Sequence, residues 1–169
     1  SSLVACLAVE ALGANAIKAL IMPNEDQSTE SVIRAVRLAE KLGVEYKNIS
    51  VDVITQSADL VVGEMIPDLS HPLVAEGVAS RIRSMLLMAY ARNNHYLMLS
   101  SANKSDLTIG HQVVGGDSSN GLGVLSDVPK IFVHKLANFV NKSDDIIPKD
   151  IILREEARSK KPHKHGKET

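Results

Sequence analysis

Polar side chains gather in this chain directly after an apolar run. The run from Tyr96 to Leu99 is typical of a buried strand. Six side chains that can bind a ligand or carry charge follow it: Ser100, Ser101, Asn103, Lys104, Ser105 and Asp106. A strand that delivers polar groups at its carboxyl end forms the usual ligand site of open α/β sheets. We therefore expect the function of the protein to reside just after Leu99.

A glycine-rich segment follows, between Gly110 and Gly123, and it contains one acidic residue, Asp117. Glycine has no side chain, so a backbone that contains several glycines can approach a phosphate group closely. An amphipathic stretch follows this segment. It is expected to form a helix that begins near Asp127, Pro129 and Lys130. Together these features predict a phosphate-binding region.

The overall composition is that of a globular domain without a nucleic-acid partner. The chain has 169 residues, of which 44% are hydrophobic and 23% charged, enough for one domain with a substantial core. Its formal net charge is −1, so no general basic field attracts nucleic acid. Aromatic residues make up 3% and Trp is absent, which argues against platforms that stack bases.

Cysteine content and hydropathy indicate the cellular setting. Cys6 is the single cysteine, so the chain has neither an internal disulfide nor a thiolate metal cluster, and a reducing, cytoplasmic location is expected. No apolar run approaches the roughly 20 residues that span a bilayer. We therefore expect no membrane partner.

The chain opens with a helix that is apolar on nearly every side, from Ser1 to Leu12, and Gly13 is placed to end it. Such a helix is buried, and within it Cys6 is interpreted as a small core residue in preference to a reactive thiol. Doubly wound sheets normally begin with a strand, so we expect the natural chain to begin before Ser1.

Strands and helices then alternate. Strands are predicted over Ala16–Met22 and Val44–Val51, and the helix between them begins after Ser28, a favourable N-cap, and ends at Gly43. A strand–helix–strand order implies parallel strands with right-handed crossovers. With Tyr96–Leu99 as a further strand, the sequence predicts an α/β fold, namely a three-layer sandwich around a parallel, doubly wound sheet.

Two further helices are predicted over Ile54–Met65 and Leu73–Arg92. The second has apolar residues on more than one face, which one sheet layer would not cover. We therefore expect it to pack against its own copy in a homodimer, with contacts near Met85, Leu86 and Met88.

The end of the chain changes character. We expect residues 1–153 to form one domain and residues 154–169 to be a basic tail without stable structure. His163 and His165 in that tail could bind a metal, but a solvated pair is the preferred interpretation. Asp144 to Leu153 fits neither helix nor strand clearly.

Several ordered motifs resemble those of the NAD synthetases, which are ATP pyrophosphatases of the adenine nucleotide α-hydrolase-like fold. The resemblance extends from Ser1 to about Ile152, and its motifs are SSLVACLAVEALG, LIMP followed by QSTESV, EGVASRIR, LSSANKSDLTIG and SDVPK. It implies a ligase that uses ATP and Mg²⁺ to adenylate the carboxylate of nicotinic acid adenine dinucleotide. Ammonia, free or derived from glutamine in a separate amidase domain, then displaces AMP to give NAD.

That reaction brings a carboxylate to a phosphate, so the site needs a metal ion and cations to offset the repulsion. The resemblance places Asp106 as the catalytic metal ligand, where the family usually has glutamate, and Lys130 as the catalytic cation at the phosphates. The resemblance also implies six residues that contact ATP: Ser1, Ile21, Met22, Gln27, Ser101 and Lys130. Core strand residues and a surface turn remain open as alternatives for Ile21, Met22 and Gln27.

The resemblance implies substrate contacts from Arg81, Asp106 and Asp117. Arg81 matches the arginine of the family's Glu-Asn-x-Gln-Ala-Arg motif, although Gly77 stands where that motif has asparagine. For each acidic residue a structural interpretation stays open: Asp106 as a helix cap, and Asp117 as a turn residue.

Two motifs of the family are absent from the sequence. The pyrophosphate-binding Ser-Gly-Gly-x-Asp-Ser loop is expected immediately before Ser1, and the segment Leu153–Ser159 does not match the family's closing segment. Two other functions therefore stay open. One is another ATP pyrophosphatase, such as the synthetase half of GMP synthetase, and the other is a non-catalytic nucleotide-binding or dimerisation module.

Overall fold

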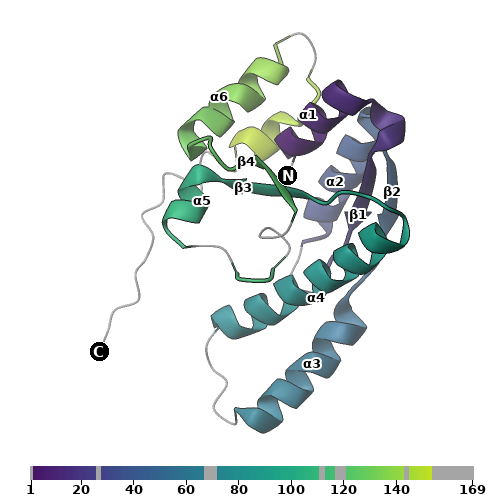
Figure 1. Ribbon diagram of the computed structural model, residues 1–169, viewed down its shortest axis with the longest axis vertical. Helices are drawn as coiled ribbons and strands as arrows, with labels where there is room; N and C mark the ends of the chain where they lie inside the picture. The colour runs from purple at the N-terminus through teal and green to yellow at the C-terminus, as the bar shows by residue number, and fades with distance from the viewer. Residues whose placement is uncertain are drawn as a thin grey trace.

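The computed structural model describes residues 2–25, 28–66, 72–110, 113–116, 121–142 and 145–153, with only the backbone of 72 and 73. Helices and parallel strands alternate along the chain (Figure 1). The elements in order are α1 (Ser2–Leu12), η1 (Ala14–Ala16), β1 (Lys18–Ile21), α2 (Thr29–Lys41), β2 (Glu45–Asn48), α3 (Asp52–Met65), α4 (Pro72–Asn93), β3 (Leu99–Asn103), α5 (Lys104–Thr108), β4 (Leu122–Leu125) and α6 (Lys130–Val140). Residues 149–153 are also helical.

β1 and β2 form a parallel pair, as the strand–helix–strand order predicts. Lys18 lies opposite Glu45 and Ile21 lies opposite Asn48. An ion pair between the side chains of Lys18 and Glu45 joins the two strands at the start of this register. The crossover helix α2 packs on both strands. The predicted strands were longer than the hydrogen-bonded segments, but their pairing direction is confirmed.

β3 and β4 form a second parallel pair, in which Leu99 lies opposite Leu122 and Asn103 opposite Leu125. The prediction of a strand over Tyr96–Leu99 is wrong in its bounds, because the strand begins where the prediction ended it. The helix α4 ends just before, where His95 has a φ of 56° and the Tyr96 amide donates to the Ala91 carbonyl at 2.8 Å. The apolar run is therefore mainly the connection between α4 and β3.

The described hydrogen bonds place β3 beside β4 in a sheet of its own, separate from the β1–β2 pair. The expectation that one hydrogen-bonded sheet joins the segments Ala16–Met22, Val44–Val51 and Tyr96–Leu99 is therefore not met within the described residues. β4 itself had no counterpart among the predicted strands. Every strand pair is nevertheless parallel and connected through helices, so the α/β fold class is confirmed.

Among the residues that the structure describes, two apolar clusters form the core. The first joins α1, α2, β4, α6 and the segment 145–153, and its buried members are Leu3, Val4, Cys6, Leu38, Leu125, Ala137, Ile147 and Ile152. The second joins β1 to α3 and α4 around Met22, Val51 and Ile82. Figure 1 shows the corresponding grouping, with α1 and α6 near one end of the molecule and α3 and α4 side by side at the other.

The first helix has the burial that its sequence predicts. Leu3, Val4 and Cys6 on α1 are buried, and Gly13 follows the helix with a φ of 81°, a conformation that glycine adopts without strain. Burial raises the pKa of the Cys6 thiol, which makes it a poorer nucleophile. The interpretation of Cys6 as a core residue is confirmed.

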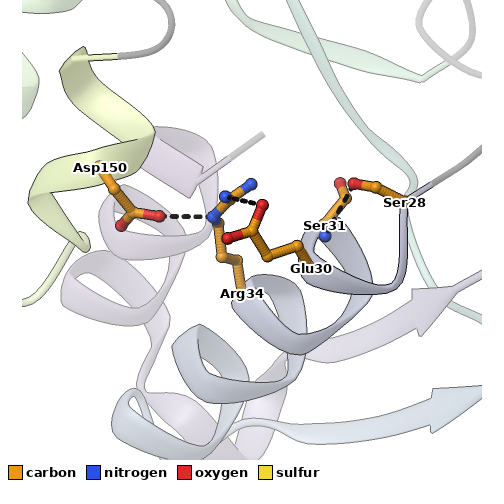
Figure 2. Close-up of polar contacts among 5 residues, drawn as sticks. All are labelled: Ser28, Glu30, Ser31, Arg34 and Asp150. Atoms are coloured by element: carbon orange, nitrogen blue, oxygen red, sulfur yellow. Dashed lines mark hydrogen bonds and ion pairs between the residues drawn. The ribbon is translucent and has the colours of Figure 1, made fainter.

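Polar side-chain contacts cap the helix α2 and attach it to a later part of the chain (Figure 2). The Ser28 hydroxyl accepts a hydrogen bond from the Ser31 amide at 3.3 Å, which confirms the predicted N-cap. Arg34 pairs with Glu30 one turn earlier at 2.7 Å and also with Asp150. The second contact ties α2 to the helical turn at 149–153, the segment that the sequence left ambiguous.

The helices α3 and α4 have the bounds predicted for them to within two residues. Both expose large apolar side chains: on α4, Met85 is 51% and Met88 45% exposed, while Leu86 packs against the second cluster. The homodimer predicted for this surface stays a prediction. Across the described ranges, no helix combines the length and apolar character needed to cross a membrane.

Candidate functional site

The carboxyl ends of β3 and β4 bring two helix starts together. β3 leads directly into α5, and β4 leads through the turn 126–129 into α6. The Lys104 amide donates to the Val128 carbonyl at 3.0 Å. The Lys130 amide donates to the Ser105 hydroxyl at 3.1 Å. Asp106 and Lys130, the two residues that the sequence singled out for chemistry, therefore lie on segments that are bonded to each other.

Asp106 belongs to a reciprocal cap at the start of α5. Its Oδ2 accepts from the Asn103 side-chain amide at 2.6 Å and from the Asn103 backbone amide at 3.3 Å, and its own amide donates to Asn103 Oδ1 at 3.1 Å. This is a capping box, the arrangement that the structural interpretation of Asp106 anticipated. Both bonds to the carboxylate end on Oδ2, so the cap fixes the direction of Oδ1.

The two serines before this cap lie differently in β3. Ser100 is buried, and its hydroxyl accepts from the Ala102 amide at 3.3 Å. Ser101 is half-buried. The Ser101 side chain is thus the more accessible of the two.

Arg81 lies on the exposed side of α4, and its guanidinium folds back along the helix. Its Nη1 donates to the carbonyl of Gly77, one turn earlier, at 3.1 Å. A Cβ at residue 77 would lie 3.0 Å from that same Nη1. The glycine that replaces the motif's asparagine thus leaves the space that the guanidinium partly occupies.

Gly116 lies against α4 at Ser80. A Cβ built on Gly116 would lie 2.3 Å from the hydroxyl of Ser80 and 2.9 Å from the carbonyl of Val113, closer than any side chain tolerates. Ser80 precedes Arg81 in α4, and Gly116 precedes Asp117 in the glycine-rich segment. Gly116 therefore makes a close contact with α4 at Ser80.

The end of β1 carries the residues expected at the adenine. Met22 is 8% exposed and packs with Val51 and Ile82, which is the core role left open as an alternative. Ile21 is half-buried.

Comparison with known protein families shows to which family this chain belongs. The family model described as NAD synthase matches residues 1–166. The chain belongs to the NAD synthase family. This confirms the resemblance drawn from the sequence motifs.

Individual members of the family are similar over most of this chain. A glutamine-dependent NAD(+) synthetase from Synechocystis sp. is 36% identical over 162 residues, which cover 96% of this chain and 29% of that protein. An NH(3)-dependent NAD(+) synthetase from Methanococcus aeolicus is 30% identical over 88% of this chain and 58% of its own length. The chain thus spans less than a third of the first of these relatives.

A solved structure gives the same result for the fold. Glutamine-dependent NAD+ synthetase from Acinetobacter baumannii, in complex with adenosine diphosphate, superposes with a TM-score of 0.87. Its sequence is 31% identical, and the match covers 90% of this chain and 30% of that one.

A metal ion in a nucleotide site takes some of its ligands from the protein and some from the substrate. Among the residues that the structure describes, no three His, Cys, Asp or Glu side chains form a group that could hold a metal ion by themselves. Mg²⁺ in nucleotide sites is commonly bound by one or two carboxylates, with phosphate oxygens and water completing its ligands. A single carboxylate such as Asp106 fits that mode of binding.

Three of the residues assigned by resemblance lie outside the described residues: Ser1, Gln27 and Asp117. Two residues without an assigned role emerge instead, because Asn103 caps Asp106 and Ser105 bonds to Lys130. The Asn-x-x-Asp spacing before a helix would have indicated the first of these contacts. The second joins residues 25 positions apart, and no local pattern indicates it.

Proposed function

We propose that this chain is the core of the synthetase part of an enzyme that forms the amide of NAD from nicotinic acid adenine dinucleotide, ATP and ammonia. The observation that carries the proposal is the bonding of the Asp106 segment to the Lys130 segment in a chain that matches the family model over residues 1–166. The relatives' names, one glutamine-dependent and one NH(3)-dependent, support ammonia as the immediate nucleophile, whether free or released from glutamine.

The proposed reaction has two steps. An oxygen of the nicotinate carboxylate attacks the α-phosphorus of ATP, and pyrophosphate leaves. Ammonia then attacks the carbonyl carbon of the mixed anhydride, AMP leaves with the original carboxylate oxygen, and the nitrogen loses its extra proton to solvent. Both steps concentrate negative charge around the phosphates, so cations placed there in advance lower the barrier.

The residues of the site divide this work by their chemistry. The ammonium group of Lys130, at the first turn of α6, would stabilise charge on the phosphates, and the half-buried Ser101 would contact ATP. Asp106 would hold Mg²⁺, which supplies charge neutralisation at the phosphate oxygens when bound. Arg81 and Asp117 would contact the dinucleotide, with Arg81 leaving its bond to Gly77 for an anionic group.

ATP binding is supported by the relative from Acinetobacter baumannii, whose structure contains adenosine diphosphate. We place the adenine near Ile21 and Met22 at the end of β1, with Ser1 and Gln27 as further nucleotide contacts. Of these, Met22 has the weakest support, because it is buried in the core.

A direct assay of product formation tests the proposal. The protein, in the longest form that its gene encodes around this chain, is incubated with nicotinic acid adenine dinucleotide, ATP, Mg²⁺ and either ammonium or glutamine. We expect NAD, AMP and pyrophosphate in equal amounts, and a large loss of rate in Lys130→Met. Binding of ATP without NAD formation would instead support the non-catalytic nucleotide-binding module.

We also propose a homodimer through α4, in a cytoplasmic protein. The exposed apolar side chains of Met85 and Met88 support a contact there. Sedimentation at micromolar concentration should give a dimer mass, and Met85→Glu with Met88→Glu should give a monomer. A monomer mass for the unaltered protein would contradict this proposal.

A further inference from the structure

The helix α6 begins without a capping side chain of its own. Its N-cap is Pro129, which offers no side-chain acceptor, and the first amides of any helix lack partners within that helix. The Lys130 amide finds its acceptor in another helix, because the hydroxyl oxygen of Ser105 on α5 lies 3.1 Å away. Ser105 therefore supplies a cap to α6 from outside it.

A second hydrogen bond fixes the same pair of segments. The Lys104 amide donates to the Val128 carbonyl at 3.0 Å. Two consecutive residues of α5 thus hold this region at two points: Lys104 bonds through its backbone to the turn before α6, and Ser105 bonds through its side chain to the first residue of α6. The backbone bond survives any substitution at these positions except proline, whereas the side-chain bond depends on the hydroxyl.

The residue that follows Ser105 is Asp106, whose carboxylate is held by Asn103 on the other side. A continuous chain of contacts therefore runs from Asn103 through Asp106 and Ser105 to Lys130. Charged groups that stabilise a transition state act best when they are fixed within about half an ångström before the reaction begins. In this series of contacts, the Ser105 hydroxyl is the side-chain group that connects the Asp106 segment to Lys130.

We propose that Ser105 is a positioning residue, which sets the place of Lys130 relative to Asp106 for the phosphate chemistry. The inference rests on the proposed function, because it assigns Ser105 a purpose in that reaction. Ser105 itself does not touch the reacting atoms. Its effect passes through Lys130, and a double-mutant cycle can detect such an indirect effect.

The cycle uses Ser105→Ala, Lys130→Met and the double variant, assayed for NAD formation in the longest form of the protein. Loss of one hydrogen bond of ordinary strength should lower kcat/KM for ATP by about fivefold to tenfold in Ser105→Ala. In the Lys130→Met background the same change should have less than about a twofold effect, because the residue it positions is gone. Ser105→Thr keeps the hydroxyl and should restore most of the rate.

Thr108→Ala is the matched control. Thr108 is on the same helix, and its hydroxyl donates to the Lys104 carbonyl within α5 at 2.7 Å. Its removal changes α5 without touching α6, so NAD formation should stay near the parent rate. Equal losses in Ser105→Ala and Thr108→Ala, or a full effect of Ser105→Ala in the Lys130→Met background, would overturn the inference and assign Ser105 a structural role only.

A measurement that needs no turnover accompanies the kinetics. The Lys130 amide proton should exchange with solvent faster in Ser105→Ala than in the parent, and Ser105→Thr should slow it again. Unchanged exchange in Ser105→Ala would overturn the inference even in an active enzyme. If the unaltered protein makes no NAD, the proposed function fails, and the inference fails with it. If the parent and Lys130→Met behave as proposed but Ser105→Ala matches the parent, only the inference fails.

Discussion

Asn103 and Asp106 hold each other at the start of α5. The side-chain amide of Asn103 donates to Asp106 Oδ2 at 2.6 Å, while the backbone amide of Asp106 donates to Asn103 Oδ1 at 3.1 Å. The cap and a metal-binding role do not exclude each other, because a carboxylate has two oxygens, and the side-chain and backbone amides of Asn103 both donate to Oδ2. Substitutions that keep the cap but change the charge can therefore separate the two roles.

Asp106→Asn removes the charge and retains an oxygen that can accept the cap bonds. If Asp106 binds Mg²⁺ as proposed, the variant should lose about 2–4 kcal/mol of transition-state stabilisation and should need more Mg²⁺. Asp106→Glu should be far milder, because glutamate is also a good partner in a capping box. Initial rates against Mg²⁺ concentration measure this, with thermal melts as a control for folding. Equal rates for Asp106→Asn and the parent at limiting Mg²⁺ would exclude Asp106 as the metal ligand.

Gly116→Ala should loosen the contact between the glycine-rich segment and α4. Its new methyl group would meet the Ser80 hydroxyl at 2.3 Å and the Val113 carbonyl at 2.9 Å, and backbone cannot yield as a flexible side chain can. We expect a loss of about 1–3 kcal/mol in unfolding free energy, measured by denaturant titration. Adding Ser80→Ala, which removes the hydroxyl and keeps a residue that favours a helix, should recover part of it. An unfolding free energy equal to that of the parent would show that the close contact does not exist in solution.

Gly77→Ala should stabilise α4 and displace Arg81. Alanine favours a helix over glycine by about 1 kcal/mol, and within the described part of the chain the new methyl group would approach one side-chain atom closely, Arg81 Nη1 at 3.0 Å. Gly63→Ala on α3 is the control, because a Cβ there meets nothing within 4 Å. The gain at Gly77 should be the smaller of the two by the cost of moving the guanidinium. Combining Gly77→Ala with Arg81→Ala should remove that difference, and a net loss of stability in Gly77→Ala would contradict the prediction.

The Lys18–Glu45 pair should give the unfolding free energy a defined pH dependence. The hydrogen bond from Lys18 lowers the pKa of the Glu45 carboxyl from its ordinary 4.5, and the bond to Glu45 raises the pKa of Lys18 from 10.5. The contribution of Glu45 is therefore present above pH 4.5 and is lost as the pH falls through its lowered pKa. The contribution of Lys18 is present below pH 10.5 and is lost as the pH rises through its raised pKa.

Denaturant titrations of the parent and Glu45→Gln between neutral and acid pH measure this effect. The stability difference between them should be constant near neutral pH and should shrink on acidification below the ordinary pKa of Glu45. Glu10→Gln, which changes an exposed glutamate on α1, is the control. A difference between parent and Glu45→Gln that does not change with pH would show that the pair contributes nothing.

Local signals predicted the helices of this chain better than its sheet. Ser28 and Gly43 mark the two ends of α2 because capping and a positive φ depend on single residues, and the structure confirms both. β3 was misplaced because the run before Leu99 resembles a strand by composition, whereas this run follows a turn at His95 and forms the connection to the strand. The sequence did not indicate β4, because glycines on either side of Leu122 weaken the strand pattern.

The site was predictable to the extent that its residues belong to motifs. Asp106 and Lys130 were singled out by their motifs, and the structure places their segments in contact. The contact itself could not be predicted, because it depends on the pairing of β3 with β4 and on a hydroxyl 25 residues from the amide it binds. The role of Gly116 was equally hidden, because a glycine in a loop does not indicate which side chain packs against it.

In the proposed reaction, the carboxylate of nicotinic acid adenine dinucleotide is adenylated before ammonia reacts. The most direct test labels both oxygens of that carboxylate with ¹⁸O, runs the reaction with ATP, Mg²⁺ and ammonium, and measures the mass of each product. Adenylation predicts AMP that carries one ¹⁸O, unlabelled pyrophosphate and NAD that keeps the other ¹⁸O in its amide. Unlabelled AMP, or ADP accompanied by labelled inorganic phosphate, would contradict the account.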